Sequence, residues 1–518
     1  MAYIVNQSGS ESFPVRPAPM RRALGHHSVR RWAVCVAALL TVNACSASDS
    51  VTSTSVSGAA ADIDEAPLGF TPASLDWAGC GGRLQCTSLD VPLDYDDPTG
   101  PMISLALAMF PARGPEPRIG ALITNPGGPG GSGVSFLDGG GPFNDEINRR
   151  FDVVSWDPRG VGGTEPLACG TELAELFLSV DLAPEDAAGR ATLERRARDD
   201  AAACTEANRA VLEHVGTDDA VRDVEAIRLA LGGEPITYVG FSYGTLIGLR
   251  YAERFPSGLR GMALDGIIDP EHTLGDQMAT TAMAIDRSLA EVLAACDAGC
   301  PIDGDPLTAY RQLVEQARSE PLRTDDGEQV AANAVVLAGI AVTYDVGLRD
   351  LFYAAISEGQ RGRGNVVQQL AEGFVGQFDL ASTVAVSCLD LPHLGSVADV
   401  EDLATTAANG AAVVPGLVSG YIRAFTLPCI DWPVEPPSAL LPVTAGGSPP
   451  ILVIGNTGDS ATPYESARRV AGTLEHGRLL TYHGAAHTTY GKDDCADAYI
   501  DAYLLELSLP PSGNDCPA

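Results

Sequence analysis

The sequence predicts an α/β fold with a mostly parallel central sheet, helices on both faces and a helical segment inserted after the sixth strand. Three observations support this prediction. Apolar strand-like runs alternate with helix-like stretches over residues 120–270, helix-like stretches alone fill residues 271–433, and the alternation returns over residues 450–518. Buried parallel strands read as continuous apolar runs, and each needs a long crossover, usually a helix, to reach the next strand.

The first 69 residues differ in composition from the rest of the chain. Arginine pairs precede a short apolar run, Trp32 to Leu40, and a stretch rich in Ser, Thr, Ala and Asp follows from residue 46. This order is typical of a secretory signal peptide and a flexible tether. The apolar run is shorter than the roughly 20 residues that span a bilayer. We expect a signal segment over residues 1–45, starting at Met1 or Met20, and a tether over 46–69.

Cysteine usage also indicates export. Residues 42–45 (Val-Asn-Ala-Cys) resemble a bacterial lipobox, so we expect either a lipid anchor on Cys45 or plain secretion. Of the 12 cysteines, ten remain after Cys35 and Cys45 are set aside. An even number suits disulfides in an exported protein. Nearness in sequence suggests the pairs Cys80 with Cys86, Cys169 with Cys204, Cys296 with Cys300, Cys388 with Cys429, and Cys495 with Cys516.

The charge balance excludes several classes of partner. Acidic residues exceed basic ones by 34, and Lys492 is the single lysine of the chain. Nucleic acid and an anionic membrane surface are therefore disfavoured as partners, so we expect membrane contact only through a lipid on Cys45. The cysteine spacings lack the paired pattern beside histidines that a structural zinc site uses, and we expect neither a metal nor an organic cofactor.

Two parts of one core flank the helical insertion. We expect core over residues 70–270 and 434–518, with a helical cap over 271–433. The expected strands are 89–95, 103–109, 120–124, 151–156, 236–239, 259–264, 450–455 and 478–482. The expected helices include 219–231, 278–296, 307–319, 330–358, one starting at a capping box over 462–465, and 495–507.

A Gly-x-Ser-x-Gly turn at residues 240–244 is the centre of the predicted chemistry. It follows a strand-like run and opens into a helix-like stretch, which is the setting that this motif requires. Glycines beside the serine permit a sharp turn, which exposes the Ser242 hydroxyl near a helix N-terminus. Such a serine can attack a carbonyl group. The alternative is a chance match in a flexible, glycine-rich loop.

A second glycine-rich segment, residues 125–133, follows the strand at 120–124. Glycines let the backbone approach a ligand closely and point its N–H groups at a developing negative charge. No Gly-Lys-Ser/Thr follows, which argues against a phosphate-binding loop. A purely structural turn is the other alternative.

A serine needs a base to take its proton and a third group to orient that base. Asp459 lies in a strand-to-helix loop and His487 in the last such loop, so the chain order is serine, acid, histidine. Histidine suits the role because its pKa is about 6.5. The alternatives are Asp265 as the acid and His483 as the base, or a turn-capping Asp459 with a surface His487.

These motifs together resemble the secreted tripeptidyl aminopeptidase group of the prolyl-iminopeptidase-like α/β-hydrolases, over about residues 70–518. The quoted segments are 125–133, 157–162 (Asp-Pro-Arg-Gly-Val-Gly), 240–245, 458–463 and 484–487. Actinobacterial exported proteases and carboxylesterases share this pattern. The resemblance implies an α/β-hydrolase fold and places the oxyanion donors at the backbone N–H of Tyr243 and of Gly128, or of Gly127.

The resemblance also implies a cap that restricts the site to peptide ends. The expected activity is release of short peptides, tripeptides in this family, from free N-termini through an acyl-enzyme. A carboxylate would hold the substrate ammonium group, and Asp269, Glu271 and Asp390 are the candidates. A carboxylesterase with the same triad is the alternative, and a non-catalytic binding protein on a hydrolase scaffold is a further one. Peptides or proteins are the expected partners.

Overall fold

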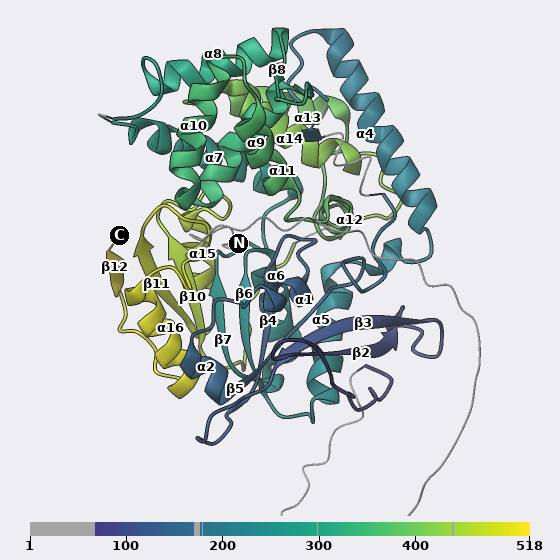
Figure 1. Cartoon of the computed structure of the whole chain (residues 1–518). Coiled ribbons are helices and arrows are strands. Elements are labelled where there is room, and N and C mark those ends of the chain that lie inside the picture. Colours follow the sequence, from purple (N-terminus) through teal and green to yellow (C-terminus); the bar gives the residue numbers. More distant parts are fainter. Residues whose placement is uncertain (1–67, 170–176, 179, 298, 438–439, 518) are drawn as a thin grey trace, which may run out of the picture. The chain divides into compact units, whose positions relative to one another are not determined.

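The computed structural model describes residues 68–169, 177–178, 180–297, 299–437 and 440–517 (Figure 1). The expected signal segment, Cys45 and nearly all of the expected tether lie outside these residues. Leu68, at the end of the expected tether, is already buried. In the described ranges no helix is both long enough and apolar enough to cross a membrane.

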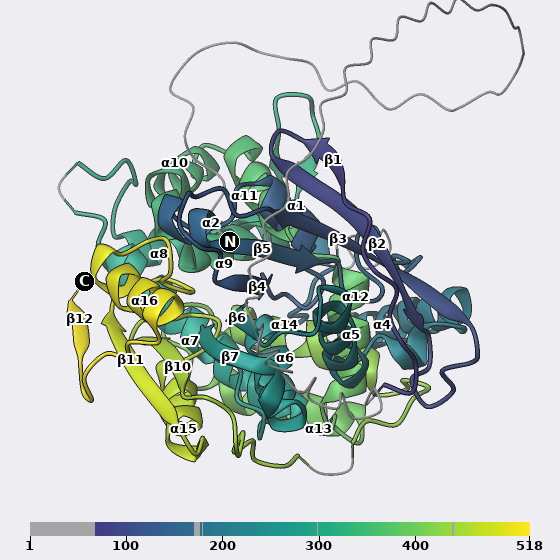
Figure 2. The same ribbon diagram turned by 90° about the horizontal axis from the view of Figure 1, so that it is seen from below.

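A ten-stranded sheet forms the centre of the described core, in the order β1-β2-β3-β5-β4-β6-β7-β10-β11-β12. Strands β1, β2, β3 and β5 pair antiparallel, and the remaining pairs from β5 through β12 are parallel. Figures 1 and 2 show the antiparallel strands (purple) at one end of the sheet and β10 to β12 (yellow) at the other. The bounds are β1 Ala78–Gly81, β2 Leu84–Pro92, β3 Met102–Phe110, β4 Gly120–Asn125, β5 Phe151–Trp156, β6 Ile236–Phe241, β7 Leu259–Asp265, β10 Ile451–Asn456, β11 Gly477–His483 and β12 Asp515–Pro517.

The mostly parallel sheet with helices on both faces is confirmed. Leu122 and Ile123 of β4 show the two faces, because they belong to different buried clusters. Helices α1, α2 and α16 pack in one cluster, and α5, α6 and α15 in the other. The core helices are α1 Gly133–Asp138, α2 Asp145–Arg150, α4 Ala187–Asn208, α5 Thr217–Ala230, α6 Tyr243–Arg254, α15 Tyr464–Thr473 and α16 Asp494–Glu506, with 3₁₀ turns η1 Leu212–His214 and η2 Pro256–Gly258.

The cap follows β7, which is the seventh strand. The expectation of an insertion after the sixth strand missed β1, a four-residue strand that has no apolar alternation to reveal it. The cap consists of helices and one short hairpin (green in Figure 1). Its elements are α7 Leu274–Ala294, α8 Pro306–Ser319, β8 Leu322–Arg323, β9 Gln329–Val330, α9 Ala332–Tyr344, η3 Val346–Leu348, α10 Arg349–Gly359, α11 Asn365–Val375, α12 Leu380–Asp390, α13 Val397–Ala408, α14 Pro415–Thr426 and η4 Leu427–Cys429.

The capping box expected at residues 462–465 is not formed. Helix α15 begins at Tyr464, but Pro463 is its N-cap and no side chain caps it. The Thr462 hydroxyl instead donates to Asp459 Oδ2, 3.0 Å away. A hydrogen bond to an ionised carboxylate is stronger than one between neutral groups, so it is favoured over capping the helix. The residue read as a helix cap therefore belongs to the site.

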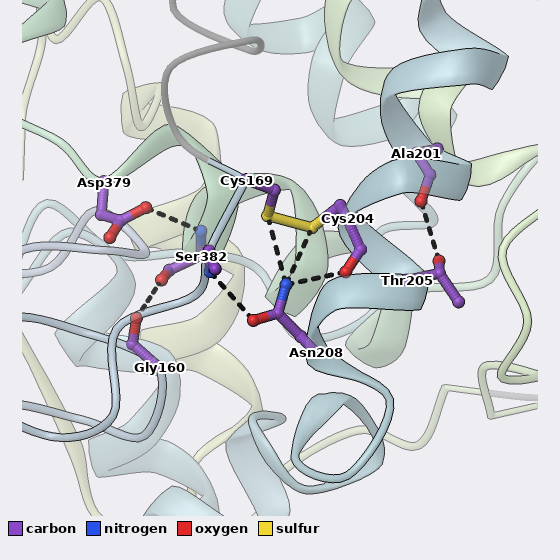
Figure 3. The surroundings of a disulfide bond; sticks show 9 residues. Gly160, Cys169, Ala201, Cys204, Thr205, Asn208, Asp379 and Ser382 are labelled. Atoms are coloured by element: carbon purple, nitrogen blue, oxygen red, sulfur yellow. Dashed lines mark hydrogen bonds between the residues drawn. A yellow bond between two sulfur atoms is a disulfide. The ribbon is translucent and has the colours of Figure 1, made fainter.

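All five expected disulfides are present between the cysteines that were paired by nearness in sequence. Figure 3 shows the bond between Cys169 and Cys204, beside which Asn208 donates to the Cys204 carbonyl oxygen over 2.7 Å and accepts from the Ala168 N–H over 2.9 Å. The pair Cys388–Cys429 joins the end of α12 to η4 inside the cap.

Candidate active site

Ser242 lies in the turn between β6 and α6 with φ 54° and ψ −124°, a conformation that non-glycine residues rarely adopt. The two glycines of the motif are required by contacts. A Cβ on Gly240 would collide with the carbonyl oxygen of Gly244, and a Cβ on Gly244 would lie 2.5 Å from the Asn125 carbonyl oxygen. Ser242 is 7% exposed. Strained backbone at such a turn is typical of a functional position.

Asp459 and His487 form a buried pair after β10 and β11. The Nδ1 atom of His487 lies 3.0 Å from Asp459 Oδ1 and 3.1 Å from Oδ2. The backbone N–H groups of Ala461 and Thr462 donate to Oδ1 over 2.8 and 2.9 Å. Burial alone would raise the pKa of Asp459, but the neighbouring imidazole and these donors hold that pKa below its usual value. Asp459 is therefore ionised and orients the ring.

The second ring nitrogen of His487, Nε2, is buried and has no hydrogen-bond partner in the described part of the chain. The Ser242 hydroxyl is therefore not bonded to it in this structure. The two residues nevertheless adjoin the same turn, because the Ser242 N–H donates to the Asp265 carbonyl over 3.0 Å and His487 Cε1 adjoins Gly266. Such bonds are often loose in free enzymes and tighten with substrate.

Neither alternative to this pair has the geometry of a triad member. Asp265 Oδ2 accepts the N–H groups of Thr489 and Tyr490 over 2.7 and 2.8 Å, so it holds the backbone of the histidine loop and not the ring. Burial raises the pKa of Asp265, and those two donors partly offset the rise. His483 is half exposed at the end of β11, where it pairs with Asp515 over 3.1 Å.

The histidine loop is also held by Lys492, the single lysine of the chain. Its ammonium group donates to the carbonyl oxygen of His487 over 2.6 Å and to the carbonyl and hydroxyl oxygens of Thr488 over 3.3 and 3.2 Å. Thr488 has φ 64°, so this turn needs outside support. Burial lowers the pKa of the Lys492 ammonium group.

The glycine-rich loop after β4 lies directly against the serine turn. A Cβ on Gly127 would be 2.8 Å from Ser242 Cβ and 3.0 Å from the Tyr243 nitrogen. The Gly127 N–H donates to the Asn125 side chain over 2.9 Å and is engaged inside the loop. Gly128, with φ 115°, lines the same cavity as Ser242.

The structure does not bring the three carboxylates considered for amine binding to Ser242. Asp269 is buried and pairs with Arg469, while its other oxygen accepts the Glu271 N–H over 2.9 Å. Glu271 is exposed. The side chains of Asp390 and Thr217 are joined by a hydrogen bond, and none of the three carboxylates lines the cavity at Ser242. The sequence places these carboxylates in or beside the expected cap, but it does not reveal that Arg469 and Thr217, which are distant in the chain, bind two of them.

Asp390 gives a pH-dependent prediction. Burial raises the pKa of Asp390 to about 7, against the hydrogen bonds from Thr217. Because the pKa of Asp390 is higher in the folded than in the unfolded state, the contribution of Asp390 to the free energy of unfolding is greatest below about pH 4. This contribution falls as pH rises from about 4 to about 7. Asp390→Asn should remove this loss. We expect the melting temperature of the variant, relative to the parent, to increase between pH 4 and pH 7 and to stay level above. A constant difference would contradict the raised pKa.

A cavity lies between the cap and Ser242. Its wall is mostly apolar. Arg318 is the only charged side chain in its described lining, and no carboxylate is present there. The cap residues Tyr344 and Phe374 contribute aromatic rings, and the Tyr344 ring also packs edge-on against His487 with centroids 5.3 Å apart. Sequence patterns did not single these residues out, because a buried aromatic in a cap helix looks like core.

The cap is hydrogen-bonded to the acid loop. Ser460 donates to the Thr343 carbonyl oxygen at the end of α9, and the Thr281 hydroxyl of α7 donates to the Ala461 carbonyl oxygen, both over 2.9 Å. Ser460 and Ala461, the core residues of these two hydrogen bonds, lie within two residues of Asp459. The cap therefore helps to shape the surroundings of the buried pair.

Comparison with known proteins agrees with this fold. An alpha/beta hydrolase fold model matches residues 120–330, and a TAP-like protein model matches residues 417–516. Serine protease Hip1 of Mycobacterium tuberculosis is 33% identical over 465 residues, which cover 84% of this chain and 88% of that protein. Carboxylesterase B of the same species is 31% identical, covering 83% and 86%, and tripeptidyl aminopeptidase of Streptomyces lividans is 27% identical, covering 84% of each.

The fold and site define a capped α/β-hydrolase. The matches place it more closely: the chain belongs to the TAP-like group of α/β-hydrolases, and it is similar over most of its length to the serine protease, the carboxylesterase and the aminopeptidase named above. The resemblance drawn from the sequence motifs is confirmed, and the protein is a hydrolase of this group.

Proposed function

We propose that this chain is an exported serine peptidase that releases short peptides, tripeptides among them, from N-termini through an acyl-enzyme. Ser242 Oγ attacks the carbonyl carbon while His487 Nε2 takes its proton, and Asp459 orients the ring and stabilises the imidazolium. The protonated histidine then gives its proton to the leaving amine. Water then attacks the acyl-enzyme while His487 takes its proton, and His487 returns that proton to Ser242 Oγ as the acyl group leaves as a carboxylic acid. No step needs a metal or an organic cofactor.

The oxyanion of the tetrahedral intermediate would be held by the backbone N–H groups of Tyr243 and Gly128. Gly127 is the weaker candidate because its N–H already donates to the Asn125 side chain. The free Nε2 atom of His487 also fits this scheme, since it is the atom that must accept the proton. A movement that brings the Ser242 hydroxyl within hydrogen-bond distance of Nε2 would complete the site.

The observation that carries the proposal is the mostly apolar cavity that ends on Ser242 beneath the cap. A cavity covered by a cap accepts an acyl group of limited size, and apolar walls favour apolar side chains beside the cleaved bond. The names of the serine protease and the aminopeptidase among the relatives support peptide cleavage. The five disulfides support export, and we propose that Cys45 carries a lipid anchor.

One observation favours a second candidate, a carboxylesterase. The described lining of the cavity contains no carboxylate, so a free ammonium group inside would lack an anionic partner. Burying an unpaired charge is costly, which favours a neutral acyl group. The same acyl-enzyme chemistry would then act on short acyl esters.

Three sets of substrates distinguish these activities in the purified protein: peptide nitroanilides with free amino termini, the same peptides acetylated, and p-nitrophenyl esters. We expect cleavage of peptides with apolar residues at the cleaved bond, and none by Ser242→Ala. Cleavage of the free set alone establishes an aminopeptidase. Cleavage of both peptide sets indicates broader peptidase action, and turnover of esters alone would replace the peptidase proposal with the carboxylesterase.

A further inference from the structure

The first turn of the cap helix α12 contacts the glycine-rich loop beside Ser242. The Thr383 hydroxyl lies 2.6 Å from the Pro129 carbonyl oxygen, the nearer of its two acceptors, and 2.9 Å from the Asp379 carbonyl oxygen of its own helix. The Asp379 N–H donates to the Gly130 carbonyl oxygen over 3.2 Å. The approach is so close that a Cβ on Gly130 would collide with the Asp379 carbonyl oxygen. The two residues that follow Gly128 are therefore held by this end of α12.

The last residue of α12 reaches the other side of the serine turn. Asp390 Oδ1 accepts the Thr217 N–H over 2.8 Å, and Oδ2 accepts the Thr217 hydroxyl over 2.5 Å. The same hydroxyl oxygen lies 2.7 Å from the hydroxyl oxygen of Tyr243, the residue that follows the nucleophile. A buried chain of hydrogen bonds thus runs from α12 to Tyr243.

Thr383 and Asp390 are seven residues apart, so they lie on the same face of the helix and about 10 Å apart along its axis. The helix between them is a rigid element. Residues 380–389 are all buried, and the disulfide of Cys388 with Cys429 ties its last turn to η4. Ser382, on a different face, donates to the Gly160 carbonyl oxygen over 2.7 Å (Figure 3).

We propose that α12 is a brace that sets the spacing of the two oxyanion donors, with Thr383 and Asp390 as its positioning residues. This inference rests on the proposed function, in which the N–H groups of Gly128 and Tyr243 bind the oxyanion. The donors come from segments more than 100 residues apart in sequence, and α12 is hydrogen-bonded toward both. Oxyanion stabilisation requires donors held at about 3 Å from the developing charge, and small displacements are costly.

The test uses p-nitrophenyl acetate, whose small acyl group does not depend on the rest of the cavity. Thr383→Val removes one hydroxyl without changing the size of the side chain, and Asp390→Ala removes the acceptor of Thr217. We expect each to lower kcat by about 10-fold to 100-fold with little change in KM, because a displaced donor weakens binding of the transition state and not of the substrate. Affinity for a boronic acid, which mimics the tetrahedral intermediate, should fall by a similar factor.

Ser382→Ala is the matched control, because Ser382 lies on the same buried helix but donates to Gly160. It loses one buried hydrogen bond, so its melting temperature should fall about as far as that of Thr383→Val, while its kcat stays at the parent value. Thr383→Ser and Asp390→Asn, which keep a hydroxyl and an acceptor, should recover most of the activity. If Asp390→Ala does not fold, Thr383→Val and its serine counterpart carry the test alone.

Two results would overturn the brace. One is a parental kcat in folded Thr383→Val, and the other is a rise in KM with kcat and boronate affinity unchanged, which would assign these residues to substrate binding. Failure of the proposed function looks different, whatever the variants of α12 do. Ser242→Ala would keep its activity if Ser242 is not the nucleophile, and peptide nitroanilides would stay uncleaved if the protein is an esterase.

Discussion

Replacing Ser242 by alanine will lower kcat about 10⁶-fold, the size of loss that follows removal of a triad serine alone. The hydroxyl is the only group of the turn that can form the acyl-enzyme, and alanine leaves the contacts of Gly240 and Gly244 unchanged. The measurement is single-turnover hydrolysis of the best peptide nitroanilide or p-nitrophenyl ester. A fluorophosphonate should label the parent at Ser242, seen by peptide mass spectrometry, and should leave the variant unlabelled.

The melting temperature provides the control for this variant, since it should stay near that of the parent. Activity above about 1% of the parent in a homogeneous sample would show that another group is the nucleophile. That outcome would also remove the assignment of His487 as its base.

Asp459→Asn should lower kcat about 10⁴-fold with the binding of substrate nearly unchanged. The amide can donate to His487 Nδ1, and the ring then carries its proton on Nε2, the atom that must accept one from Ser242. Asp459 is buried and touches the ring at 3.0 and 3.1 Å, so water cannot replace it easily. The measurement is the ratio of kcat values over pH 6 to 9.

Asp265→Asn is the matched control for that variant. Asp265 is equally buried and lies at the end of β7, but it accepts the backbone N–H groups of Thr489 and Tyr490. We expect a fall in melting temperature and a loss of kcat at least 100-fold smaller than that of Asp459→Asn. The reverse order would make Asp265 the acid of the site.

The parts of the fold that follow from local patterns could be predicted from the sequence. Strands β4 and β10 read as apolar runs because both of their faces are buried, and the glycines at 240 and 244 are needed by short backbone contacts. The disulfides followed from nearness in sequence. Strand β1 was not predicted. The helix expected over residues 330–358 consists of two helices, α9 and α10, which η3 separates.

The parts that depend on distant partners could not be predicted. Asp269 pairs with Arg469, which lies 200 residues later in the chain, and Asp390 accepts two hydrogen bonds from Thr217, so neither carboxylate is available to an amine. The sequence also gave no sign that Thr383 touches the glycine-rich loop, since a threonine in a helix usually bonds to its own backbone. Tertiary contacts decide which carboxylates remain available.

Lys492 has a practical consequence for anyone who handles this protein. Apart from the N-terminus, amine-reactive chemistry has a single target in the whole chain. Lys492 as a whole is exposed, but its ammonium group is partly buried where it donates to the carbonyl oxygen of His487. Coupling to beads or dyes through lysine would attach the support to the loop that carries His487. Acetylation removes the positive charge and most of its donors, whereas reductive methylation keeps the charge. Immobilisation through carboxylates, which are plentiful on this acidic chain, would distribute the attachment over many other positions.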